Sequence, residues 1–220
     1  MKKAFIFDLD GTLLDSMGIW ANFGVEYLTT KGITQIPGNL RDILTPMSLL
    51  EAADYFRIQF GLSQSVQQIY DEINSMLLYK YKHEVQLKKD VLEFLQSHAD
   101  HKMCIATATD RCLVENALHR LGIAPYFQFV ITSSEVGNSK QNPDIYWQAA
   151  SRLGVDISDC IVFEDALHAI RSAASAGFYV VGVYETFFEP HLERIKDTAN
   201  SFVHTLKEFS YEYSVDHCRL

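Results

Sequence analysis

The sequence has few of the residues that mark several classes of protein. Its 220 residues include only 11 Gly and 5 Pro, and no period repeats along it, which excludes collagen-like and repeat architectures. The most apolar stretch, residues 178–184, is far shorter than the roughly 20 residues of a membrane-spanning helix. Asp8 and Asp10 interrupt the apolar run near the N-terminus, so we expect no signal peptide and no membrane association.

Basic residues are scarce relative to acidic ones. The 19 Lys and Arg residues and 28 Asp and Glu residues give a net charge of −9 at pH 7. Because nucleic-acid-binding proteins need basic patches, we expect no nucleic-acid partner. A phosphorylated small molecule is still compatible with an acidic chain, since a local cation or metal reverses the field at one site. Hydrophobic residues make up 48% of the chain, which excludes a disordered protein.

Cysteine is also sparse. The chain has four cysteines, at positions 104, 112, 160 and 218, and they show neither metal-ligand nor CxxC spacing. We therefore predict reduced thiols in a cytoplasmic protein. Cys104 and Cys160 lie in apolar runs that predict core strands.

The order of apolar runs and helical patterns predicts the fold class. Residues 3–9 form a short apolar run typical of a strand buried on both faces. Residues 16–83 have helical periodicity and no strand pattern, with a capping box from Ser48 to Glu51. From residue 84 onward, helical segments alternate with strands predicted at 103–107, 129–132, 160–163 and 179–183, and with a short one at 202–203.

This alternation predicts an α/β fold with a doubly wound parallel sheet. The first strand belongs to that sheet, so the helical stretch is an insertion after it. We predict a core domain of residues 1–15 and 84–220, interrupted by a helical cap domain of residues 16–83.

Polar residues follow the predicted strand ends, where ligands bind in open α/β sheets. They are Asp8, Asp10, Thr107, Lys140, Glu164 and Asp165. Four carboxylates at one edge would repel each other strongly unless a divalent cation lay among them. Oxygen ligands without His or Cys suit Mg²⁺, and a single lysine suits a phosphate that bridges lysine and metal.

These residues carry a family resemblance. The run Asp8-Leu-Asp10-Gly11-Thr12, followed by Thr107, Lys140 and Glu164-Asp165, resembles the four motifs of the haloacid dehalogenase superfamily in order and spacing. The resemblance covers the whole chain, and it is to the phosphatases and β-phosphoglucomutases with a small helical cap. It implies a Rossmann-like core, Mg²⁺ as cofactor and a phosphoric monoester hydrolase that acts on a small phosphorylated metabolite.

The resemblance also implies a role for each residue. Asp8 would attack phosphorus and form an aspartyl-phosphate. Asp10 would act as general acid and then general base, and its main-chain carbonyl would help to hold the metal. Thr107 would hydrogen-bond a phosphoryl oxygen. Lys140 would pair with the phosphoryl group and with Asp8. Asp165 would bind Mg²⁺ together with Asp8, with Glu164 as close support at the metal site.

Several positions depart from the pattern of that family. Gln141 follows the lysine where proline is usual, and Ala166 and Ala169 stand where Ser and Gly are usual. Trp20 occupies the position of a histidine in β-phosphoglucomutases, and residues 45–50 lack their phosphate-gripping arginine. These two changes favour simple hydrolysis over a sugar-phosphate mutase.

Other assignments stay open at this point. A non-enzymatic receiver-type phospho-acceptor also uses acids, a hydroxyl and a lysine, but it has no helical insertion. Thr109, Asp110 and Arg111 are further candidates for substrate contact, and a helix cap is the favoured reading of Asp110. Trp20, Met47 and Tyr79 are read as the core of the cap, with the alternative that one of them faces the cleft. We expect a monomer or weak homodimer.

Overall fold

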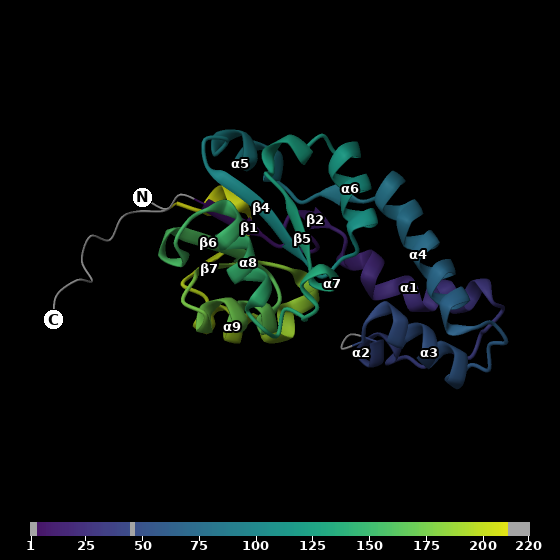
Figure 1. The fold of residues 1–220 in the computed structure, drawn as a ribbon. Coiled ribbons are helices and arrows are strands. Elements are labelled where there is room, and N and C mark those ends of the chain that lie inside the picture. The colour runs from purple at the N-terminus through teal and green to yellow at the C-terminus, as the bar shows by residue number, and fades with distance from the viewer. Residues whose placement is uncertain (1–3, 45–46, 211–220) are drawn as a thin grey trace. The chain divides into compact units, whose positions relative to one another are not determined.

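The computed structural model describes residues 4–44 and 47–210, which Figure 1 colours along the chain. They divide into two compact units: a helical unit, Ser16–Val85, and a larger unit made of the chain on either side of it. No helix within the described ranges is both long and apolar enough to cross a membrane. Cys218, one of the predicted reduced thiols, lies outside the described residues.

A six-stranded sheet forms the centre of the larger unit. Its strands are β1 (Ala4–Phe7), β4 (Lys102–Thr107), β5 (Val130–Thr132), β6 (Cys160–Glu164), β7 (Tyr179–Val183) and β8 (Ser201–Val203). They lie in the order β5-β4-β1-β6-β7-β8, and all neighbours pair in parallel. Because the chain winds outward from β1 in both directions, the sheet is doubly wound, which confirms the predicted fold class.

Helices cover both faces of this sheet (Figure 1). They are α5 (Val91–Ser97), α6 (Arg111–Arg120), α7 (Ser133–Val136), α8 (Asp144–Leu153), α9 (Leu167–Ser175) and α10 (Leu192–Thr198). Alternate residues of β1 serve opposite faces. Ala4 and Ile6 join the core that α8 and α9 contribute to, whereas the rings of Phe5 and Phe7 meet Phe94 of α5.

Strand positions in the larger unit follow the sequence closely. The strands predicted at 103–107, 129–132, 160–163, 179–183 and 202–203 are each confirmed to within one residue at either end. Cys104 and Cys160 are fully buried in β4 and β6, as predicted. The predicted first strand is too long, since β1 ends at Phe7. Two short strands were not predicted, β2 (Leu14–Asp15) and β3 (Gln86–Leu87), which pair antiparallel.

The helical unit contains α1 (Met17–Thr30), α2 (Leu40–Leu44), α3 (Leu49–Gln59) and α4 (Val66–His83), and no strand among its described residues, as predicted. Ser48 and Glu51 form the expected capping box at the start of α3. Trp20 is partly buried, and its indole donates to the Tyr81 hydroxyl at 2.8 Å. Tyr79 is 60% exposed, so its assignment to the core of the cap is wrong.

Candidate active site

The carboxyl ends of β1, β4 and β6 carry the predicted polar residues. Asp8 directly follows β1, Thr107 is the last residue of β4, and Glu164 is the last residue of β6. Asp8 continues the sheet, because its backbone N–H donates to the Phe163 carbonyl at 2.9 Å. The three residues therefore lie at one edge of the sheet. Because their side chains are buried, the local dielectric constant is low.

Lys140 connects two of these acids. It lies between α7 and α8, and its ammonium donates to Asp8 Oδ1 and, at 2.6 Å, to Glu164 Oε1. Burial would lower the pKa of Lys140, but the charges and hydrogen bonds of Asp8 and Glu164 raise it above its usual range. Lys140 is therefore a fixed cation beside Asp8.

Glu164 accepts hydrogen bonds on both carboxylate oxygens. Oε1 accepts from Lys140 and, at 3.0 Å, from the hydroxyl of Tyr146 on α8. Oε2 accepts from the backbone N–H groups of Asp165 and Ala166 at 3.0 and 3.1 Å. Burial acts to raise the pKa of Glu164, but Lys140 and the backbone donors lower it overall. This geometry favours a role in holding Lys140, and metal binding by Glu164 stays a prediction.

Asp165, unlike Glu164, has a carboxylate oxygen that accepts no hydrogen bond from the described residues. Its Oδ1 accepts from Thr12 Oγ1 at 3.4 Å, whereas its buried Oδ2 has no hydrogen-bond partner among the described residues. Burial, together with the charges of Asp8 and Glu164, raises the pKa of Asp165 well above its ordinary value. A buried carboxylate oxygen without a partner is costly unless a cation or donor satisfies it.

Three acids lie close enough to share a cation. Asp8, Glu164 and Asp165 each offer a carboxylate oxygen, and these oxygens lie within 4.8 Å of one another. Burial and the charges of Glu164 and Asp10 raise the pKa of Asp8 to about 7, although Lys140 opposes this shift. The oxygen donors and the unsatisfied Asp165 Oδ2 therefore fit a hard divalent cation such as Mg²⁺.

Asp10, which is not one of these three acids, is positioned by Thr109. Thr109 donates from Oγ1 to Asp10 Oδ2 at 2.5 Å. The backbone N–H of Thr109 in turn donates to Thr107 Oγ1 at 3.1 Å, which orients that hydroxyl. Arg111, a candidate for substrate contact, instead pairs with Glu135 through two guanidinium nitrogens.

Two residues of the site were not identified from the sequence. Tyr146 is fully buried on α8, at a position whose helical spacing indicates only core packing. Thr12 lies within the first motif, but nothing in its spacing indicates a bond to Asp165, which is 153 residues away in the chain.

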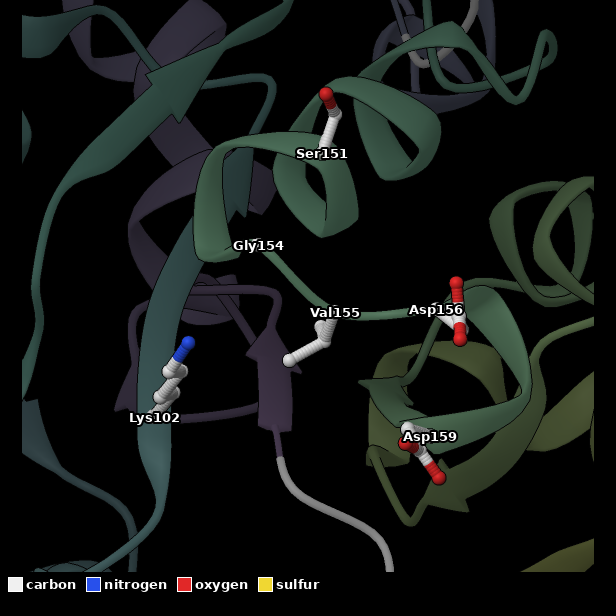
Figure 2. A pocket seen from close by; sticks show the side chains of 6 residues that line it. All are labelled: Lys102, Ser151, Gly154, Val155, Asp156 and Asp159. Atoms are coloured by element: carbon white, nitrogen blue, oxygen red, sulfur yellow. The ribbon is translucent and has the colours of Figure 1, made fainter.

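A hollow in the larger unit lies away from these residues. It has a volume of about 410 Å³ and is lined by Lys102, Ser151, Gly154, Val155, Asp156 and Asp159 (Figure 2). Lys102 begins β4, and Asp156 and Asp159 precede β6, so this hollow is at the amino ends of the strands. Lys102 already donates to the Leu153 carbonyl at 2.7 Å. The candidate active site is thus the buried cluster at the carboxyl ends.

The fold and the motif residues define a family. A model of the haloacid dehalogenase-like hydrolase family matches residues 5–183, and the chain belongs to this family. The predicted family resemblance is confirmed, as is the class of enzyme, a phosphoric monoester hydrolase.

Individual relatives cover most of the chain. Fructose-1-phosphate phosphatase YqaB of Escherichia coli is 28% identical over 81% of this chain and 94% of that protein. The phosphorylated carbohydrates phosphatase of Thermotoga maritima is 28% identical over 80% of this chain and 82% of that protein. A β-phosphoglucomutase structure from Clostridium difficile has a TM-score of 0.73 and 24% identity, covering 96% of this chain and 94% of that one. That last likeness concerns the fold alone.

Proposed function

We propose that the chain is a Mg²⁺-dependent phosphatase that hydrolyses a small phosphorylated carbohydrate through an aspartyl-phosphate on Asp8. The observation that carries this proposal is the buried cluster of Asp8, Lys140, Glu164 and Asp165, in which Asp165 Oδ2 has no partner among the described residues. Support for the substrate class comes from two relatives whose names specify fructose 1-phosphate and phosphorylated carbohydrates.

In the first step, a carboxylate oxygen of Asp8 attacks phosphorus, and the bond from phosphorus to the leaving oxygen breaks. Asp10 gives its proton to that leaving oxygen, so the product alcohol departs neutral. Lys140 and the Thr107 hydroxyl donate to phosphoryl oxygens whose charge changes during transfer. Thr109 holds the Asp10 carboxyl group by its 2.5 Å hydrogen bond to Oδ2, which leaves Oδ1 to carry the proton.

In the second step, Asp10 takes a proton from water as the water oxygen attacks phosphorus. The bond from phosphorus to Asp8 breaks, which restores the carboxylate and releases inorganic phosphate. Asp8, Asp165 and the main-chain carbonyl of Asp10 would hold Mg²⁺. When bound, Mg²⁺ supplies positive charge that offsets the repulsion between the carboxylates and the phosphate.

A panel of phosphorylated metabolites, with phosphate release as the readout, tests this proposal. We expect release from sugar phosphates that needs Mg²⁺, stops with a chelator and is absent in Asp8→Asn. A mutase would instead form glucose 6-phosphate from β-glucose 1-phosphate with a bisphosphate primer. A receiver-type phospho-acceptor would accumulate a stable phospho-protein without turnover. Either of these outcomes would contradict the proposal.

Further parts of the proposal concern partners and location. We propose a cytoplasmic monomer or weak homodimer whose only ligands are Mg²⁺ and the small phosphorylated metabolite, with no nucleic-acid or membrane partner. Size-exclusion chromatography with light scattering at several concentrations measures the mass in solution. A stable higher oligomer would contradict this part.

A further inference from the structure

A second lysine, Lys88, lies partly buried at the same edge of the sheet. The Lys88 side chain is 17% exposed, and its ammonium donates to three oxygens. They are the carbonyls of Gly11 and Tyr184, both at 2.6 Å, and Glu185 Oε2 at 2.9 Å. Since an ammonium has three hydrogens, this set uses its whole donor capacity. Lys88 is therefore held in one position.

Lys88 links three segments that are far apart in the sequence. It directly follows β3, Tyr184 and Glu185 follow β7, and Gly11 lies in the turn after β1. The backbone N–H of Lys88 also donates to the Leu13 carbonyl at 2.9 Å. Lys88 thus binds the turn of residues 10–13 through both its backbone and its side chain.

This turn contains two groups of the proposed metal site, the Asp10 carbonyl and the Thr12 side chain that donates to Asp165. Gly11 has a φ of +84°, which other residues rarely adopt, and its N–H donates to the Leu14 carbonyl at 2.9 Å. That N–H shares its peptide plane with the Asp10 carbonyl, so its bond sets the direction of the carbonyl. Thr12, the next residue, is fully buried and donates to Asp165. A shift of Gly11 would therefore move both groups.

The pair of Lys88 and Glu185 has no evident stabilising advantage by itself. The Glu185 side chain is 7% exposed, and its Oε1 accepts from the Phe187 N–H at 3.3 Å. Well-packed apolar residues often replace a buried ion pair without loss of stability. The hydrogen bond from Lys88 to the Gly11 carbonyl gives a different reason for the presence of this ion pair. The positive charge of Lys88 also partly opposes the burial and the acidic neighbours that raise the pKa of Asp165.

We propose that Lys88, braced by Glu185, is a positioning residue that fixes the turn of residues 10–13 in the conformation required for Mg²⁺ binding. This inference rests on the proposed function. Residues that orient metal ligands from outside the coordination shell commonly change metal affinity by about 10- to 100-fold when replaced. We expect a loss of that size when Lys88 loses its donors.

The test measures Mg²⁺ binding to the full chain by isothermal titration calorimetry, without substrate. Lys88→Met removes the donors but strands the buried charge of Glu185. The double variant Lys88→Met/Glu185→Gln also removes that charge, so it separates stability from positioning. Lys89→Met, at the exposed neighbouring position, is the matched control for loss of one positive charge. Chemical unfolding in EDTA gives the stability of each variant.

We expect the double variant to recover much of the stability that Lys88→Met loses but to bind Mg²⁺ about 10-fold or more weakly than the wild type. Lys89→Met is expected to bind like the wild type. Wild-type affinity in the double variant, or its failure to fold, would overturn the inference and assign the pair a purely structural role. If the wild type neither binds Mg²⁺ nor releases phosphate, the proposed function fails and this inference fails with it.

Discussion

Replacement of Glu164 by Gln is a sharp test of how the buried cluster is held together. The substitution keeps the size of the side chain but exchanges one acceptor oxygen for an NH₂ donor. In the wild type, Oε1 faces Lys140 and Tyr146, and Oε2 faces two backbone N–H groups. In either orientation of the amide, its NH₂ faces two donors that lose their acceptor.

The expected loss of stability follows from the two buried donors that are left without an acceptor. Each buried donor left without an acceptor costs about 1–3 kcal/mol. Breaking a buried ion pair by removing one partner typically costs about 3–5 kcal/mol, and here Lys140 keeps Asp8 as a second partner. We therefore expect Glu164→Gln to lower the free energy of unfolding by about 3–5 kcal/mol at pH 7.

The assay must report on the larger unit alone. The chain has two tryptophans, Trp20 in the helical unit and Trp147 on α8. A Trp20→Phe background therefore makes urea unfolding, followed by fluorescence, specific for the unit that contains Glu164. Glu193→Gln is the control, because the Glu193 side chain is 83% exposed and its loss should cost less than about 0.5 kcal/mol. A loss below about 1 kcal/mol in Glu164→Gln would refute the reasoning.

The pH dependence of stability gives an independent test of the Glu164→Gln substitution. Burial acts to raise the pKa of Glu164, but Lys140 and the backbone donors lower it below 4.5 overall. The stabilisation by Glu164 is therefore complete above pH 4.5 and is lost as the pH falls through the lowered pKa of the folded state. Glu164→Gln should lack this contribution, so its loss of stability relative to the wild type should shrink at low pH.

Three further predictions concern the residues around the cluster. Thr109→Val removes the donor to Asp10, so kcat should fall by about 10-fold while KM changes little. This loss is a part of the roughly 10²–10⁴-fold rate enhancement typical of acid–base catalysis. An unchanged kcat would contradict this role of Thr109. Tyr146→Phe should lower the free energy of unfolding by about 1 kcal/mol, and a double-mutant cycle with Glu164→Gln should be non-additive. Burial and neighbouring acids raise the pKa of Asp8 to about 7, and Mg²⁺ favours its carboxylate form. The acid limb of the pH–rate profile should therefore move to lower pH as Mg²⁺ increases, and a limb independent of Mg²⁺ would exclude this coupling.

The sheet could be predicted from the sequence because its strands are strongly apolar. The run Ala4–Phe7 is buried on both faces, and such a run is typical of a central parallel strand. Phe202 and Val203 were enough to predict β8. By contrast, β2 and β3 contain two residues each, too few for any periodicity to appear.

The motif residues could be predicted from the sequence, but their partners could not. Asp8, Lys140 and Asp165 follow apolar strands or lie between helices, where the carboxyl edge of the sheet collects polar side chains. The bond from Thr109 to Asp10 joins residues 99 positions apart, and it depends on the register of two strands. Tyr146 has the spacing of a core aromatic, and only its contact with Glu164 shows that its hydroxyl serves the site.

The measurement that tests the mechanism most directly is covalent trapping of the enzyme during turnover. The chain is mixed with a sugar phosphate substrate and Mg²⁺, quenched rapidly with acid and reduced with borohydride, which converts an acyl phosphate of aspartate to homoserine. Peptide mass spectrometry then locates the modification. We predict homoserine at position 8, dependent on substrate and absent in Asp8→Asn. Turnover without modification of Asp8, or modification at another carboxylate, would contradict the assignment of Asp8 as the nucleophile.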